Sequence, residues 1–327
     1  MSKAVPTSTP DITPDRRIER FDIAWLLAPL APAILATGPL LYWLTDAQWT
    51  SWLPVIAFPL GMPLLEQMLG EDGHASIDTG TSGHVYYRYL VYFFVPVPWI
   101  AFTACAWLIS VHDSLWYSAL PLAVTAGMLG SLSLNAIHEL GHSRRRVDRV
   151  LAWLAWVPSG FGRFAILHGR VHHKYVGTHV EPSSARMGEP IYRFAVRDIF
   201  DAYLCAWQAE KGRLEGLGRS PWSGGNELIQ TTAATLVYWG ALAMWLGFAI
   251  IPYLLLAALW SQGQHTLVSY LEHYGLGRRR LADGSFEPVR ASHAWNGNSL
   301  ASNRVLLQLP RHSDHHLHSR KPYWQVR

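Results

Sequence analysis

The amino-acid sequence predicts an all-α membrane protein, a bundle of six transmembrane helices with a histidine-rich cap on its cytoplasmic side. Half of the 327 residues are hydrophobic and only 15% are charged, whereas a typical soluble domain carries about 25% charged residues. The apolar residues gather in long stretches, and most of the 16 histidines lie between those stretches. These observations together favour a helical membrane bundle over a soluble domain.

Each predicted span is long enough to cross the hydrocarbon core of a bilayer, which takes roughly 20 mostly apolar residues in a helix. Six stretches meet this length, at residues 22–45, 50–69, 88–110, 116–137, 228–249 and 251–271. The second contains Pro54, Pro59 and Pro63, so we expect kinks there, which membrane helices tolerate where neighbours satisfy the freed carbonyls. The fifth and sixth stretches abut, and we expect a tight hairpin that turns at Pro252.

Basic residues set the orientation of the bundle, because cytoplasmic loops carry an excess of lysine and arginine. The segments after the fourth and sixth stretches are arginine-rich, whereas the connections at 46–49 and 111–115 contain no lysine or arginine. Both termini and both long polar segments are therefore predicted to be cytoplasmic. The expected organisation is a cytoplasmic N-terminal tail (1–20) and one membrane-embedded domain (21–327), whose cytoplasmic active-site segments are 138–227 and 272–327.

Cysteine content and net charge narrow the kinds of site and partner. Cys105 and Cys205 lie far apart in apolar surroundings, and the 327 residues contain no CxxC motif. These residues therefore contain no zinc or rubredoxin-type site that is built on a CxxC pair of thiolates. The formal net charge is only +4, and we expect no nucleic-acid partner.

Histidines recur in four clusters, each in or at the edge of a segment assigned to the cytoplasm. Residues four apart share one face of a helix, whereas adjacent residues point about 100° apart and can serve two different metals. Imidazole is a common ligand of iron, zinc and copper. The clusters supply nine candidate metal ligands: His138, His142, His168, His172, His173, His273, His312, His315 and His316.

The remaining seven histidines are expected to form hydrogen bonds or to face solvent. His265 lies two turns before His273, so we expect it to face the bundle interior. His293 is a candidate for a supporting role, and His318 is expected to take no part. A metal-bound imidazole commonly donates its other N–H to a carboxylate or a carbonyl. Three carboxylates adjoin ligands in sequence and are candidates to accept such a hydrogen bond, namely Glu139, Glu272 and Asp314.

The four motifs resemble those of the integral-membrane di-iron alkane 1-monooxygenase (alkane hydroxylase) and xylene monooxygenase family, part of the membrane fatty acid desaturase/hydroxylase superfamily. The motifs are "HELGH" (138–142), "HGRVHH" (168–173), "EHYGL" (272–276) and "RHSDHH" (311–316), and the resemblance spans roughly 60–316. The last two motifs are the discriminating pair, since acyl desaturases share the histidine boxes but not that combination.

The resemblance implies a desaturase-like bundle in a bacterial inner (plasma) membrane, with two iron ions held by the same nine histidines. It also implies O2 as co-substrate, an apolar hydrocarbon substrate entering from the membrane, and electrons from a separate rubredoxin and its NADH-dependent reductase. The implied activity is hydroxylation of an unactivated C–H bond, first of all the terminal methyl of a medium-chain n-alkane, giving a primary alcohol.

Three positions depart from the family pattern and keep alternatives open. Leu167, Ser269 and Pro310 stand where the family usually has Glu, Asn and Gln. An aryl-methyl (xylene-type) monooxygenase is therefore an alternative, and a fatty acyl desaturase is a weaker one. A membrane metal transporter is the non-enzyme alternative. It should carry ionisable ligands at mid-bilayer, whereas these clusters lie at one membrane face.

Overall fold

The computed structural model describes residues 23–73, 84–112 and 114–326. Within these ranges the chain is helical and forms no β-strand, only two isolated bridges, Glu71 with Ser299 and Arg280 with Phe286. This confirms the all-α prediction. The predicted tail over 1–20 lies outside the described residues.

Four helical segments of the described chain are long and apolar enough to cross a membrane. They are formed by α1 (Leu27–Thr45), α2 (Leu53–Leu69), α3 (His84–Phe93) with α4 (Val97–Val111), and α5 (Trp116–Gly141), with short 3-10 turns η1 (Ile23–Leu26) and η2 (Gln48–Trp52) before α1 and α2. These segments match the first four predicted stretches. The second stays α-helical across Pro59 and Pro63, and the third is interrupted between α3 and α4.

The fifth and sixth predicted stretches are also helical, as α10 (Glu227–Leu246) and α11 (Ile251–His273), but they are not among those four segments. Asn226 starts α10, because its side-chain oxygen accepts hydrogen bonds from the backbone N–H groups of Leu228 and Ile229. The chain reverses at Gly247, whose φ of 94° favours glycine. The prediction of a turn at Pro252 was wrong, because Pro252 lies in the first turn of α11, where its missing N–H costs no hydrogen bond.

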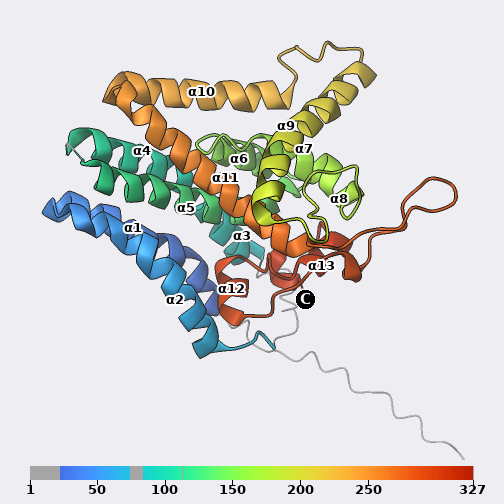
Figure 1. Ribbon diagram of the computed structural model, residues 1–327, viewed down its shortest axis with the longest axis horizontal. Helices are drawn as coiled ribbons and strands as arrows, with labels where there is room; N and C mark the ends of the chain where they lie inside the picture. The colour runs from blue at the N-terminus through green and yellow to red at the C-terminus, as the bar shows by residue number, and fades with distance from the viewer. Residues whose placement is uncertain (1–22, 74–83, 113, 327) are drawn as a thin grey trace, which may run out of the picture.

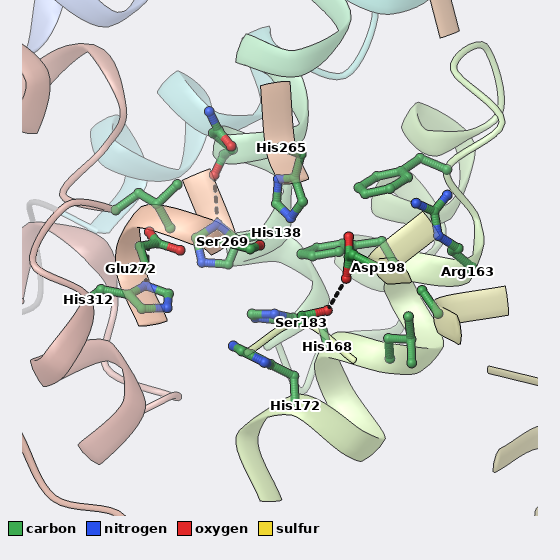
Figure 2. Close-up of a pocket in the computed structure, with 16 residues that line it drawn as sticks. His138, Arg163, His168, His172, Ser183, Asp198, His265, Ser269, Glu272 and His312 are labelled. Carbon is green, nitrogen blue, oxygen red and sulfur yellow. Dashed lines mark hydrogen bonds and ion pairs between the residues drawn. The ribbon is translucent and has the colours of Figure 1, made fainter. Parts of the chain in front are cut away.

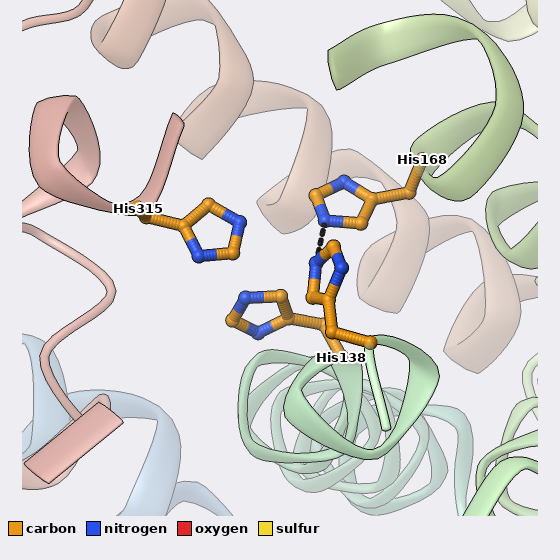
Figure 3. Close-up of side chains that lie close together, drawn as sticks. His138, His168 and His315 are labelled. Atoms are coloured by element: carbon orange, nitrogen blue, oxygen red, sulfur yellow. Dashed lines mark hydrogen bonds between the residues drawn. The ribbon is translucent and has the colours of Figure 1, made fainter. Parts of the chain in front are cut away.

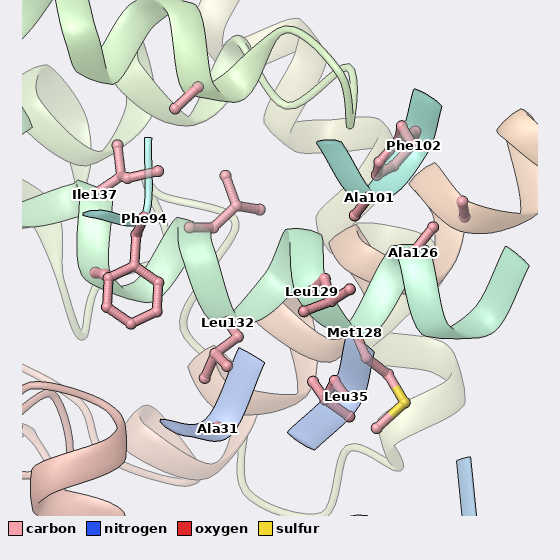
Figure 4. Close-up of a cluster of buried hydrophobic side chains, with 14 of the residues drawn as sticks. Ala31, Leu35, Phe94, Ala101, Phe102, Ala126, Met128, Leu129, Leu132 and Ile137 are labelled. Atoms are coloured by element: carbon pink, nitrogen blue, oxygen red, sulfur yellow. The ribbon is translucent and has the colours of Figure 1, made fainter. Parts of the chain in front are cut away.

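Helix α5 lies at the centre of the bundle and packs against α11, α4 and α1 (Figure 1). Leu129 and Leu132 of α5 belong to the main hydrophobic core, together with Leu35 of α1 and Phe102 of α4 (Figure 4). Gly127 allows the close approach of α11, since a Cβ there would lie 2.7 Å from the carbonyl oxygen of Ala257. Small residues permit such close contacts between membrane helices. This packing fixes α5 and α11 relative to each other.

The remaining helices form a cap at the C-terminal ends of α5 and α11. They are α6 (Arg146–Trp156), α7 (Arg163–Leu167), η3 (His168–His172), α8 (His173–Tyr175), α9 (Ile191–Gly216), η5 (Ala291–His293), α12 (Leu300–Val305), α13 (His312–Leu317) and η6 (Tyr323–Gln325). Figure 1 shows α13 beside the end of α11. Tyr323 is buried in the final turn and donates a hydrogen bond to the carbonyl oxygen of Tyr87, 3.0 Å away. The end of the chain is thus packed against α3.

Candidate metal centre

The C-terminal end of α5 carries the first two candidate ligands. His138 lies in the last turn of α5, and His142 is its C-cap residue. The Nδ1 atom of His138 lies 2.6 Å from the carbonyl oxygen of Asn135, one turn earlier. Because a carbonyl can only accept, Nδ1 carries the proton and Nε2 keeps its lone pair. That Nε2 atom is buried and has no hydrogen-bond partner among the described residues.

A π-helical turn, η3, carries the second cluster. It joins α7 to α8 and contains His168 and His172, with His173 directly after it. Arg170 of this turn forms ion pairs with Glu210 of α9 and, at 2.7 Å, with Glu227 of α10. Single π turns are frequent at functional sites. Two neighbouring helices therefore hold the turn that presents His168 and His172 and leads into His173.

Helix α13 brings the last cluster next to His273 at the end of α11. The approach to α13 is a buried turn in which Leu307 and Gln308 have φ values of 50° and 62°. This left-handed conformation costs a non-glycine residue about 1–2 kcal/mol, and such strain gathers at functional sites. The turn is fastened by Asp72, whose buried carboxylate lies 3.1 Å from the guanidinium of Arg311 and 2.9 Å from that of Arg304.

The structure brings eight of the nine histidines together in two groups. In each group the ring nitrogens lie within 4.8 Å of one another, close enough to hold one metal ion. The first histidine group consists of His138, His142, His168 and His315, and the second of His172, His273, His312 and His316. Figure 3 shows three members of the first group converging from separate segments.

The ninth histidine, His173, lies between the two groups. Its Nε2 is 3.1 Å from the Nε2 of His168 in the first group. Its ring centroid is 4.9 Å from those of His315 in the first group and His316 in the second. The adjacent pair His315–His316 divides between the two groups, as its divergence on a helix predicts, whereas His173 belongs to neither group.

The donor set fits metal ions. Besides His168 and His173, three more pairs of Nε2 atoms approach closely: His142 and His168 at 2.8 Å, His312 and His316 at 2.9 Å, and His273 and His312 at 3.1 Å. Two nitrogens that each lie about 2 Å from one ion reach such separations. The Nε2 of His315, like that of His138, is buried without a hydrogen-bond partner in the described chain. Lone pairs that converge on a shared point suit a cation there.

Burial favours the neutral form of six of these imidazoles, which is the form that metal ligation requires. It lowers the pKa of His142 to about 3 and that of His173 to about 2, with a further lowering from neighbouring histidines. Burial and the same neighbours hold the pKa values of four more imidazoles well below the usual range: His168, His312, His315 and His316.

The second histidine group has further partners on its Nδ1 atoms. The Nδ1 of His172 lies 3.2 Å from the carboxylate of Glu181, and that of His273 lies 3.2 Å from the carbonyl oxygen of His293. Burial would raise the pKa of Glu181, but His172 and the hydroxyl of Ser184 outweigh burial, so the pKa is lowered. Glu181 is therefore a carboxylate in direct contact with a candidate ligand.

The three carboxylates expected beside the ligands occupy different positions. Glu272 lies 3.3 Å from the Nδ1 of His312. Glu139 lies 3.9 Å from the Nε2 of His138 and accepts a hydrogen bond from the backbone N–H of Tyr323. Asp314 contacts the Nδ1 of His318 at 2.7 Å and the ammonium of Lys321 at 2.6 Å. The structure thus brings Glu272 to a candidate ligand and engages Asp314 with cap side chains.

A narrow cavity of about 40 Å³ adjoins both groups, which has room for a few water molecules at most. Figure 2 shows His138, His168, His172 and His312 around it, with Asp198 and Arg163 farther along the wall. His265 lines the same cavity, as expected from its place on α11, and it stacks edge-on against Phe164.

Sequence reasoning missed Glu181 and the carbonyl groups of Asn135 and His293. Glu181 follows His173 by eight residues in an irregular segment, so no helical periodicity relates the two positions. A backbone carbonyl leaves no mark in sequence. The one available signal was the presence of Glu181 in "HVEPSS", within the histidine-rich segment. Its contact with His172 becomes visible only in the folded chain.

Comparisons with known proteins bear on this site. The fatty acid desaturase family model matches residues 114–327, which include all nine histidines. The chain is 36% identical to alkane 1-monooxygenase 1 of Alcanivorax borkumensis, over 100% of this chain and 82% of that protein. It is 35% identical to alkane 1-monooxygenase of Ectopseudomonas oleovorans, over 95% and 78%. The xylene/toluene monooxygenase hydroxylase component of Pseudomonas putida is more distant, at 26% over 62% and 53%.

Proposed function

Because this chain belongs to the alkane 1-monooxygenase family, within the wider fatty acid desaturase family, we propose that it hydroxylates the terminal methyl of a medium-chain n-alkane with O2 to give a primary alcohol. The observation that carries the proposal is the pair of histidine groups, four ring nitrogens each, with His173 between them. Two metal positions side by side suit oxidation of a C–H bond that no acid or base can activate.

The proposed ligands are the nine histidines, and the proposed metal is iron. When bound, the two ions supply the activation of O2 and the oxidation of the C–H bond. The protein supplies the rest. Asn135 and Glu181 fix the orientations of His138 and His172, and the buried surroundings of the cluster exclude bulk water from the reacting atoms.

The membrane arrangement is also part of the proposal. We infer six spans, with α10 and α11 completing the four apolar segments, in a single domain over 21–327 of the inner membrane. Both termini and the cap would be cytoplasmic. The support is the arginine-rich composition of the segments after α5 and α11.

Electrons would arrive from a separate rubredoxin reduced by an NADH-dependent reductase. A cleft of about 370 Å³ supports an acidic donor, since four cationic side chains line it against two carboxylates, Glu139 and Asp148, and His142 lies at its wall. These cations are Arg88, Arg144, Arg320 and Lys321. Complementary charge speeds the encounter of two proteins.

An aryl-methyl substrate is the second candidate, favoured by the similarity to the xylene/toluene enzyme. Both candidates are tested by supplying the purified protein, in lipid or detergent, with iron, rubredoxin, its reductase and NADH. We expect octanol from octane. A benzylic alcohol formed in preference from a methylarene would favour the second candidate, and no alcohol from either substrate would refute both.

A further inference from the structure

Glu181 is one of the most completely enclosed carboxylates near the histidines, with 1% of its side chain exposed. One oxygen lies 3.2 Å from the Nδ1 of His172 and accepts a hydrogen bond from the backbone N–H of Ser183 at 3.1 Å. The other accepts a hydrogen bond from the hydroxyl of Ser184. The hydroxyl of Ser183 in turn donates to Asp198 at 2.8 Å. The carboxylate is therefore fixed in place by the segment that holds it.

This contact determines how His172 can act. A carboxylate accepts the proton of Nδ1, which leaves the lone pair of Nε2 for a metal ion. The same hydrogen bond makes Nε2 of the imidazole more basic and so a stronger electron-pair donor to a metal ion. His172 belongs to the second histidine group, so the negative charge of Glu181 acts on that position.

The two groups differ in this respect. In the second, Glu181 lies in hydrogen-bond contact with the Nδ1 of His172, whereas Glu272 lies 3.3 Å from the Nδ1 of His312 and forms no hydrogen bond with it. In the first, His138 meets the neutral carbonyl of Asn135. The nearby Glu139 is 3.9 Å from the Nε2 of His138, too far for a hydrogen bond. Among the described residues, the candidate ligand whose ring forms a hydrogen bond with a carboxylate is therefore His172, which belongs to the second group.

We propose that Glu181 is a positioning residue for His172 and that it makes the second histidine group the tighter of two inequivalent metal positions. The inference rests on the proposed function, because it takes both groups to be metal sites. A buried anion near one position favours a dication there and opposes its loss and its reduction. The ion at the first group should therefore be released to a chelator first and be reduced first.

The test uses the full-length protein loaded with isotopically enriched ferrous iron. Wild type should hold about two irons per chain, give two distinct Mössbauer doublets of equal area, and release iron to a chelator in two phases. Glu181→Gln removes the charge but keeps an acceptor. It should weaken the tighter ion by about 10–100-fold, a usual cost of losing a group that orients a metal ligand, and should alter one doublet. Glu181→Asp, which keeps the charge, should restore part of the loss.

Glu189→Gln is the matched control, since Glu189 is a buried carboxylate of the same segment that pairs with Arg197 at 2.8 Å. It should leave both iron affinities unchanged. If wild type held two irons but gave one doublet and one release phase, the inference would be overturned and the proposed function would stand, whether or not Glu181→Gln folds. The inference would also be overturned if Glu181→Gln kept both iron affinities. A wild type that binds fewer than two irons would refute the proposed function, and the inference with it.

Discussion

At the scale of single residues, the site depends on neutral imidazoles held by fixed partners. His273 shows this, since its ring is fully buried, its Nδ1 faces the carbonyl of His293, and its Nε2 lies 3.1 Å from that of His312. An imidazole with one nitrogen occupied by a carbonyl has one nitrogen left for a metal.

Replacing this residue, His273→Ala, should abolish turnover and lower the iron content below two per chain, because it removes a ligand atom. The measurements are alcohol formation and elemental analysis of the purified protein. His318→Ala is the control, since His318 is exposed and contacts Asp314, and it should keep its iron. Turnover retained by His273→Ala would refute its assignment as a ligand.

Acidification should destabilise the metal-free protein. His142 has a pKa of about 3 in the folded protein, whereas an unfolded histidine titrates near 6.5. Above pH ~6.5 the imidazole of His142 is unprotonated in both the folded and the unfolded protein. Between pH values of about 6.5 and 3 it is protonated only in the unfolded protein. Each such histidine therefore costs up to about 1.4 kcal/mol of stability per pH unit as the pH falls through that range.

This dependence is measured by thermal unfolding from pH 7.5 to 5. His142→Asn removes one titrating group, so its stability should fall less steeply with decreasing pH. An equally steep fall in the variant would contradict the assignment of a lowered pKa to His142.

At the scale of elements, the π turn at His168–His172 depends on helices α9 and α10. Arg170 ties the turn to Glu210, whose side chain is fully buried and also pairs with Arg213 at 2.7 Å. Glu210→Gln should destabilise the protein by about 1.5–3 kcal/mol, the usual worth of hydrogen bonds to charged groups, and should lower iron retention.

Thermal unfolding and iron content check this prediction together. Glu215→Gln on the same helix is the control, because Glu215 is half exposed and lies 3.9 Å from Lys211, and such surface pairs contribute about 0–1 kcal/mol. If the two variants had the same stability and iron content, the ion pair between Arg170 and Glu210 would not be what holds the turn in place.

At the scale of the whole molecule, the close packing of α5 on α11 holds the two ends that carry His138 and His273. Gly127→Ala would place a methyl group 2.7 Å from the Ala257 carbonyl oxygen, so one helix must shift. We expect a loss of about 1–3 kcal/mol, typical of overpacking, and less iron per chain.

Gly240→Ala is the matched control on α10, where no atom lies within 4 Å of the added Cβ. It should stabilise the protein by up to about 1 kcal/mol, because alanine favours a helix more than glycine does, and should leave the iron content unchanged. Equal effects of the two substitutions would show that the contact between α5 and α11 does not determine the result.

The candidate ligands could be selected from sequence because metal coordination restricts residue type and spacing at once. "HELGH" places two imidazoles at the end of an apolar helix, and the structure has them at the end of α5. The turn between α10 and α11 was misplaced because proline suits both a turn and a first helical turn, whereas the positive φ of Gly247 is visible only in the backbone.

The sequence by itself determined that the protein is helical, where its apolar segments lie, and which nine histidines belong together, because hydrophobic length and ligand spacing are local properties of a chain. Only the tertiary structure decided how the histidines divide. His315 joins the first group and His316 the second, although they are neighbours, and Glu181 reaches His172. Those choices depend on the directions of side chains from α5, η3, α11 and α13, and the packing of the four segments fixes those directions.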